Sequence, residues 1–140
     1  VTRSSPITLM QAGPSVRRGP GLLAQAHGAS GEDAAAAHLA RLGYSILDRN
    51  FKTRTGEIDI VAREGATVVF VEVKRREAPD HGTAAEFVSP AKMRKVVNAA
   101  RLWAAKHGLT DSLIRFDVIA IDVIDGREQL RHHKGAFDAR

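Results

Sequence analysis

The chain of 140 residues has the length and composition of one globular domain, with 44% hydrophobic and 26% charged residues. It contains no cysteine, which excludes disulfides, cysteine-ligated zinc, iron–sulfur clusters and a thiol nucleophile. No apolar run approaches the ~20 residues that span a bilayer, and none has the pattern of a secretory signal. A cytoplasmic protein that makes no membrane contact is therefore expected.

The net charge of +5 comes from the two ends of the chain. Residues 1–30 carry three arginines and no acidic residue, residues 31–125 are neutral overall, and residues 126–140 have a net charge of +2. A basic protein is a candidate for binding nucleic acid, but binding by the neutral middle has to be judged from local clusters.

Three segments are predicted. Residues 1–29 contain several prolines and glycines and show no hydrophobic periodicity, which is typical of a disordered basic tail. Residues 30–125 predict a single α/β domain, and residues 126–140 a weak terminal strand or tail.

The domain is predicted to begin with a helix over residues 30–42. Ser30 opens a sequence that resembles a capping box, and Gly43 stands where a residue that ends a helix belongs. A short strand is predicted over residues 44–49, followed by a polar connection over residues 50–55.

A β-hairpin is predicted next. Residues 57–64 alternate polar and apolar side chains, Gly65-Ala66 reads as a turn, and residues 67–74 form a β-branched run that is the strongest strand signal in the chain. A polar loop over residues 75–88 follows.

The second half is predicted to hold a helix and a further strand. Ser89 and Pro90 predict an N-cap and a first helical position, and the helix is expected to end at Gly108. A strand over residues 113–123 leads to a hairpin-type turn at residues 125–126. The predicted fold is thus α/β in the order α-β-β-β-α-β, with a mixed central sheet that contains an antiparallel hairpin and is flanked by helices.

The hairpin brings charged residues together. A two-residue turn at residues 65–66 places Asp59 opposite Glu72 and Glu57 opposite Lys74, and all four side chains then project to one face. The residues between them predict an apolar opposite face: Ile58, Ile60, Ala62, Val69, Val71 and Val73.

Opposed carboxylates repel each other, so the pairing of Asp59 with Glu72 is costly unless a cation lies between them. Two carboxylates without nearby histidine or cysteine suit a hard cation such as Mg²⁺, which keeps several waters and takes phosphate oxygens as ligands. Lys74 lies on the same face and would orient or deprotonate a water, or stabilise phosphate charge. An exposed strand face that carries a simple charge pair is the alternative interpretation.

At these residues the chain resembles a known group of proteins. Gly56–Asp59 and, thirteen residues after the aspartate, Glu72 and Lys74 resemble the PD-(D/E)xK nuclease superfamily. More narrowly, the chain is similar to the YraN family of bacterial endonuclease-like proteins, which are similar to archaeal Holliday junction resolvases. The motifs of that family occur in order over about residues 28–123: Gly31-Glu32, Leu42-Gly43-Tyr44, Arg49-Asn50-Phe51, Phe70–Arg75 and Arg115–Val118.

The resemblance implies a restriction-endonuclease-like core in which Asp59 and Glu72 hold Mg²⁺ or Mn²⁺ and Lys74 is the catalytic lysine. It also implies that Glu32 reaches the site from the first helix as a further catalytic and metal-binding acid. From the sequence alone, a favourable interaction with the helix dipole is the simpler explanation of Glu32. The implied substrate is DNA, branched or single-stranded, and a homodimer would supply two sites for two cuts.

Two basic clusters are candidate phosphate contacts for a bound nucleic acid. Arg75 and Arg76 follow the second strand of the hairpin, and Lys92, Arg94 and Lys95 lie in the first turns of the second helix. Either cluster alone is also typical of an ordinary solvated surface.

The roles of three further residues are less clear from the sequence. Asp117 belongs either near the site or on a strand surface, and both interpretations stay open. His132 and His133 lack spaced partners, so a metal site there is not expected.

The sequence therefore favours a nucleic-acid-binding protein that acts as a Mg²⁺-dependent endonuclease on DNA phosphodiesters. One alternative is a non-catalytic nucleic-acid-binding module that retains the fold, which would have no need of Asp59, Glu72 and Lys74 together. Another is an adaptor whose basic tail docks on DNA or on a partner, and it would lose DNA affinity on deletion of residues 1–29.

Overall fold

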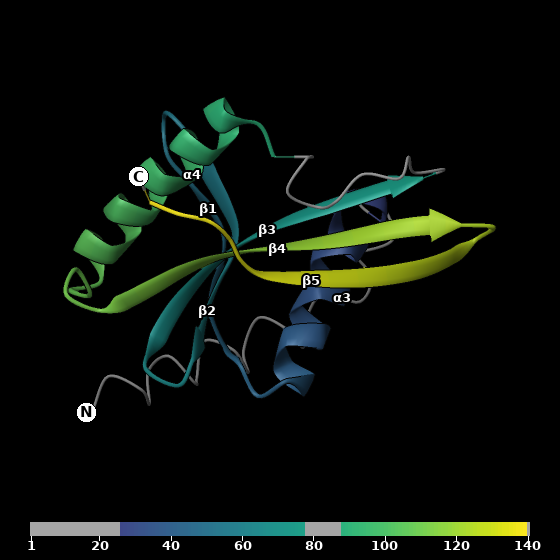
Figure 1. The fold of residues 1–140 in the computed structure, drawn as a ribbon, viewed down its shortest axis with the longest axis horizontal. Helices are drawn as coiled ribbons and strands as arrows, with labels where there is room; N and C mark the ends of the chain where they lie inside the picture. Colours follow the sequence, from purple (N-terminus) through teal and green to yellow (C-terminus); the bar gives the residue numbers. More distant parts are fainter. Residues whose placement is uncertain (1–25, 78–87, 140) are drawn as a thin grey trace.

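Two helices and five strands make up the described structure. The computed structural model describes residues 26–77 and 88–139 (Figure 1). The elements are α3 (Ala26–Arg41), β1 (Ser45–Lys52), β2 (Glu57–Glu64), β3 (Thr67–Glu77), α4 (Pro90–Lys106), β4 (Leu113–Ile124) and β5 (Arg127–Phe137). The predicted tail before residue 26 and residues 78–87 of the predicted loop lie outside the described residues. Neither described helix is long and apolar enough to cross a lipid bilayer.

The strands form one mixed sheet in the order β1-β2-β3-β4-β5. β3 and β4 are parallel, and the other neighbouring strands are antiparallel. The parallel pair needs a long crossover connection, which α4 supplies. α3 and α4 cover opposite faces of the sheet (Figure 1). The predicted α/β fold and its order of elements are confirmed, and the arrangement is consistent with a restriction-endonuclease-like core.

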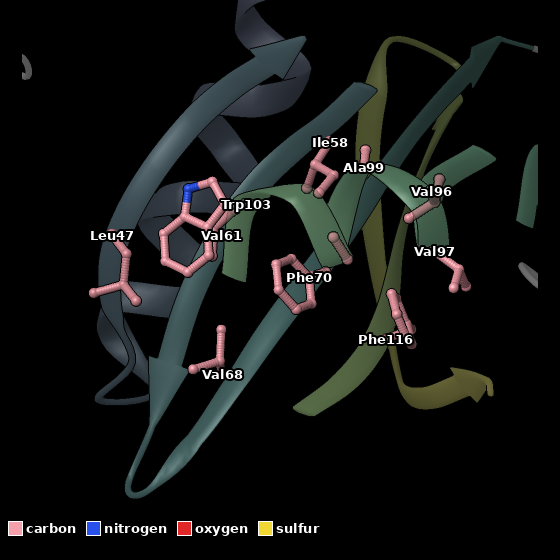
Figure 2. Packing of buried hydrophobic residues seen from close by; sticks show 11 residues of the cluster. Leu47, Ile58, Val61, Val68, Phe70, Val96, Val97, Ala99, Trp103 and Phe116 are labelled. Atoms are coloured by element: carbon pink, nitrogen blue, oxygen red, sulfur yellow. The ribbon is translucent and has the colours of Figure 1, made fainter. Parts of the chain in front are cut away.

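Aromatic side chains hold α4 on its face of the sheet (Figure 2). Trp103 on α4 packs edge-on against Phe70 on β3, with ring centroids 5.8 Å apart, and Phe70 stacks on Phe116 on β4. The indole Nε1 of Trp103 also donates a hydrogen bond of 2.9 Å to Asp48 Oδ2 on β1. Burial of side chains of this size contributes about 1.5–3 kcal/mol each. These contacts fix α4, and therefore its N-terminal turn, relative to β1, β3 and β4.

Small and aliphatic side chains hold α3 on the other face. Ala35 and Leu39 on the helix are fully buried and pack in one cluster with Ile60, Val71 and Ile121 of the sheet. Since helices cover both faces, the interior strands are apolar on both sides. The hairpin therefore has a second buried face, beneath α4, in addition to the one that the sequence predicted. This second face includes Val61, Val68 and Phe70.

Several element boundaries differ from the prediction. β1 extends to Lys52, into the predicted connection over residues 50–55, and β3 extends to Glu77, into the predicted loop over residues 75–88, because both strands continue their pairing with a neighbouring strand. α3 begins at Ala26, so Ser30 lies inside the helix and is not its N-cap. No proline interrupts residues 26–30, and the helix extends through them. β5 is an eleven-residue strand rather than a weak one. Asp125 and Gly126 both have positive φ angles, 52° and 78°, as a tight two-residue hairpin turn requires, and this turn pairs β5 along β4.

One residue of the predicted apolar face of the hairpin is on the other side. Ile58 and Ile60 are both buried, but Ile60 packs in the cluster beneath α3, whereas Ile58 packs in the cluster beneath α4 (Figure 2). The strict alternation of β2 therefore breaks at Asp59. The backbone pairing of β2 with β3 ends at Ile60–Val71, and beyond it the Asp59 side chain bonds to the backbone of β3.

Candidate active site

Asp59 and Glu72 lie side by side where β2 and β3 separate. The pairing of Ile60 with Val71 continues the predicted hairpin register, so Asp59 and Glu72 are the next residues along it. Asp59 Oδ2 accepts a hydrogen bond of 2.8 Å from the backbone N–H of Val73. The carboxylate thus takes the place of a backbone acceptor, and this bond holds it beside Glu72.

Glu72 is buried in an unfavourable environment. It is only 4% exposed, and its Oε1 has no hydrogen-bond partner among the described residues. Its Oε2 lies 3.5 Å from Nζ of Lys92 on α4. Burial and the negative charge of Asp59 raise the pKa of Glu72 to about 7, against the opposing effect of Lys92 and Lys74. At neutral pH the carboxyl group of Glu72 is therefore close to half protonated.

Asp59 is perturbed in the same direction. Burial raises the pKa of Asp59, and the hydrogen bond from Val73 and the charge of Lys92 offset part of the rise. The negative charges of the two carboxylates are therefore only partly compensated by the nearby lysines, and an added cation would stabilise both charged groups.

Two glycines lie where neighbouring elements come close to this site. A Cβ atom on Gly56, just before β2, would lie 2.6 Å from the backbone oxygen of Lys95 on α4. A Cβ atom on Gly31 would lie 3.4 Å from side-chain atoms of Arg75 on β3. Glycine at position 56 therefore allows the start of β2 to pack against α4, whereas the contact of Gly31 with Arg75 is an ordinary van der Waals distance.

Glu32 lies on α3 at the margin of the site. Burial and the charge of Asp59 raise the pKa of Glu32, so the two carboxylates interact. Glu32 is however paired with Arg49 of β1 at 3.6 Å, and Asn50 donates a hydrogen bond to it. Across the described ranges no three histidine, aspartate or glutamate side chains are grouped as a metal cage. The structure therefore brings Asp59 and Glu72 together and leaves Glu32 as an outlying acid.

Two lysines face the carboxylate pair. Lys74 follows Glu72 by two residues on β3, and its charge lowers the pKa of Glu72. Lys92, which the sequence suggested only as a phosphate contact, forms the ion pair with Glu72. Its backbone N–H donates to the side chain of Ser89, the N-cap of α4, so Lys92 lies in the first turn of the helix. The predicted N-cap at Ser89 placed Lys92 in this turn, but no sequence pattern indicated that Lys92 contacts Glu72.

The other predicted phosphate contacts fall into two groups. Arg75 is paired with Glu128 at 3.3 Å, and Arg76 with Asp122 at 3.7 Å, so both basic residues are engaged within the protein. Arg94 and Lys95 are exposed on α4.

A polar network that the sequence did not reveal surrounds Asp117. This carboxylate is fully buried and accepts hydrogen bonds from both Arg115 and the backbone of Gly135, and it is 2.8 Å from His132 Nε2. His132 Nδ1 lies 3.1 Å from Nε2 of His38 on α3. Burial would raise the pKa of Asp117, but the bonds from His132 and Arg115 hold it down at about 2. Asp117 and His132 thus tie β4, β5 and α3 together on the face opposite Lys92.

The residues present fit a divalent cation. The two carboxylates supply hard oxygen ligands, and the unpartnered Oε1 of Glu72 is a buried acceptor without a donor. Among the described residues no cysteine or histidine joins the two carboxylates in a group that could hold a metal, which favours Mg²⁺ or Mn²⁺ over zinc. Two protein carboxylates suffice for Mg²⁺, which usually keeps waters and substrate oxygens in its remaining positions.

Comparison with known proteins identifies the family. The family model described as Uncharacterised protein family UPF0102 matches residues 31–121, which include the carboxylate pair and both lysines. A UPF0102 protein of Anaeromyxobacter dehalogenans is 49% identical over 81% of this chain and 85% of its own. A relative from Geobacter sulfurreducens is 47% identical over 79% of this chain and 88% of its own, and one from Frankia casuarinae is 43% identical over 79% and 94%. The chain therefore belongs to family UPF0102, the YraN family that its motifs predict.

Proposed function

We propose that the protein is a Mg²⁺-dependent endonuclease that hydrolyses phosphodiester bonds of DNA. The observation that supports this most strongly is the pairing of half-buried Asp59 with buried Glu72, in which Oε1 of Glu72 has no partner among the described residues and the pKa of Glu72 is raised to about 7. Like charges held close together in a buried site destabilise a fold unless a cation or a proton compensates them, and perturbed carboxyl groups are frequent at functional sites.

In this proposal the side chains divide the work. Asp59 and Glu72 hold the cation, and the N–H of Val73 keeps Asp59 in place. Bound Mg²⁺ supplies neutralisation of phosphate charge and makes water more acidic. Lys74 positions the attacking water or stabilises the negative charge that develops on the phosphate. Glu32, from the margin of the site, orients water near Asp59.

DNA as the substrate rests on the resemblance to nucleases and on the basic residues around the site. Branched DNA is the substrate of the similar resolvases, and a homodimer would place two sites on one junction. We therefore propose branched DNA as the first substrate to test, together with single-stranded and duplex DNA.

The test is cleavage of branched, single-stranded and duplex DNA in parallel, with Mg²⁺, with Mn²⁺ and with EDTA. We expect the wild type to cut at least one substrate in the presence of either metal and none in EDTA, and Glu72→Gln to abolish cutting. Glu77→Gln is the matched control, because it removes an exposed carboxylate from the same strand. Cleavage that persists in Glu72→Gln, or the absence of cleavage of all three substrates by the wild type, would contradict the proposal.

A second function is favoured by one observation. Lys92 Nζ lies 3.5 Å from Glu72 Oε2, so the protein itself already neutralises part of the charge on Glu72 without a metal ion. A non-catalytic module that binds nucleic acid through the same surface is therefore the alternative proposal. It predicts salt-dependent DNA binding without cleavage of any of the three substrates.

A further inference from the structure

The basic side chains of the described residues differ in whether they are paired. Arg49, Arg75, Arg115 and Arg131 form ion pairs with acidic side chains of the protein. Several exposed cations form no ion pair with another described residue, and four of them lie on the β1–β2 turn and in the first half of α4: Lys52, Arg54, Arg94 and Lys95. The charge of these four side chains is available to an external anion.

Two of these cations lie on a rigid turn between β1 and β2. Lys52 ends β1, and Arg54 lies in the turn that leads to Gly56. The turn is closed by Thr53, whose backbone N–H and hydroxyl both donate to Gly56 O at 2.8 Å. The Thr53 hydroxyl oxygen also accepts from the backbone N–H groups of Thr55 and Gly56. The turn therefore fixes the backbone positions of its two cations, so that only their side chains need to be ordered on binding.

The other two cations lie on α4, against which this turn is packed. Gly56 touches the backbone of Lys95 so closely that a Cβ atom would be 2.6 Å from the carbonyl oxygen. The turn and the first half of α4 are therefore neighbours, with Lys52 and Arg54 on the turn and Arg94 and Lys95 on the helix.

This surface lies close to the carboxylate pair. Asp59 follows Gly56 by three strand residues, which is about 10 Å, and Lys92, the partner of Glu72, precedes Lys95 by less than one helical turn, about 4.5 Å. A distance of about 10 Å corresponds to roughly three base-pair steps of 3.4 Å. The cations are thus within reach of phosphates a few steps along the duplex from one held at the carboxylates.

We propose that the β1–β2 turn and α4 form a backbone clamp, consisting of Lys52, Arg54, Arg94 and Lys95, that grips a duplex arm of DNA beside the bond to be cut. The clamp rests on the proposed function. It assigns Lys52 and Arg54 to DNA contact, a role that the sequence alone did not suggest. A duplex is the partner because the exposed large apolar side chains of the described residues are all aliphatic, so they supply no aromatic platform for unpaired bases.

The experiment compares the variant Lys52→Ala/Arg54→Ala with the wild type in EDTA, where no cleavage interferes. Binding to a labelled duplex is followed by fluorescence anisotropy at salt concentrations from about 50 to 200 mM. The matched control is Arg41→Ala/Arg127→Ala, which removes the same charge from exposed positions at the end of α3 and at the start of β5.

Two lost phosphate contacts should reduce the slope of log K against log salt by about 1.8. The affinity advantage of the wild type over the clamp variant should therefore shrink about tenfold across that salt range, while the control keeps the wild-type slope. An unchanged slope in the clamp variant, or an equal loss in the control, would overturn the clamp and leave the proposed nuclease activity standing. A wild type that fails to bind DNA would overturn both proposals. If the slopes are as predicted but the cleavage assay with Mg²⁺ and Mn²⁺ shows no activity, the clamp is supported and only the enzymatic proposal is contradicted.

Discussion

Replacement of Glu72 by glutamine should stabilise the metal-free protein at alkaline pH. The pKa of Glu72 is raised from 4.5 to about 7, so the folded state takes up a proton over a pH range in which the unfolded chain has lost it. Stability from this group is therefore fully present below about pH 4.5 and is lost as the pH rises through about 7. The loss amounts to about 3 kcal/mol at 1.36 kcal/mol for each pKa unit.

The expected gain is about equal to this loss, because the pKa of about 7 already includes the opposing effect of Lys92. Glu72→Gln should thus be more stable than the wild type by about 3 kcal/mol at pH 8 and much closer to it at pH 5.

The assay is urea unfolding followed by circular dichroism in EDTA at pH 5, 6.5 and 8, with Glu77→Gln as the control. The wild type and the control should lose stability across this range, and Glu72→Gln should change much less. A Glu72→Gln protein that is less stable than the wild type at pH 8, or that keeps the full pH dependence, would refute the view that Glu72 is a strained carboxylate.

Three further predictions concern other side chains of the site and the network behind it. Lys74→Met should leave metal binding unchanged, measured by calorimetry, and lower the cleavage rate by roughly 10²–10⁴-fold, and an unaffected rate would exclude Lys74 from the chemistry. Asp59→Asn keeps an acceptor for the backbone N–H of Val73, whereas Asp59→Ala leaves this N–H unpaired, so chemical unfolding should show the asparagine variant to be more stable than the alanine variant by about 1–3 kcal/mol. Equal stabilities of the two variants would contradict the hydrogen bond between Val73 and Asp59. The pKa of Asp117 is about 2, so the wild type should lose about 2 kcal/mol of stability as the pH falls from about 4 to 2, and Asp117→Asn should lack this loss although it is less stable at pH 7.

Local sequence patterns were sufficient to predict the hairpin and the neighbourhood of its carboxylates. Gly65 has a φ angle of 59°, which suits the tight turn, and the turn sets the register that continues to Asp59 and Glu72. Because cross-strand neighbours follow from turn geometry and a period of two, this part of the site needed no knowledge of tertiary packing.

Features that depend on distant contacts could not be predicted. Lys92 reaches Glu72 only because Trp103 and Gly56 fix α4 against the sheet, and neither contact is visible in a local pattern. The placement of Ile58 beneath α4 follows from the Asp59 side chain, which interrupts the alternation of β2.

The network around Asp117 depends on the fifth strand. Its partner His132 lies fifteen residues further along the chain, and β5 brings the imidazole back over β4. The short turn at residues 125–126 was predicted, but the length of the strand after it was not, because its sequence is mostly polar. Tertiary pairing outweighed the weak strand propensity of this segment.

Binding of Mn²⁺ to the whole protein, followed by electron paramagnetic resonance, tests the carboxylate pair most directly. Mn²⁺ accepts the same oxygen ligands as Mg²⁺ and loses its free-ion signal when bound. We expect the wild type and Lys74→Met to bind the ion at the site, and Asp59→Asn and Glu72→Gln to lose this binding. Equal binding by all four proteins, or no binding by the wild type at millimolar Mn²⁺, would contradict the assignment of Asp59 and Glu72 as a metal site.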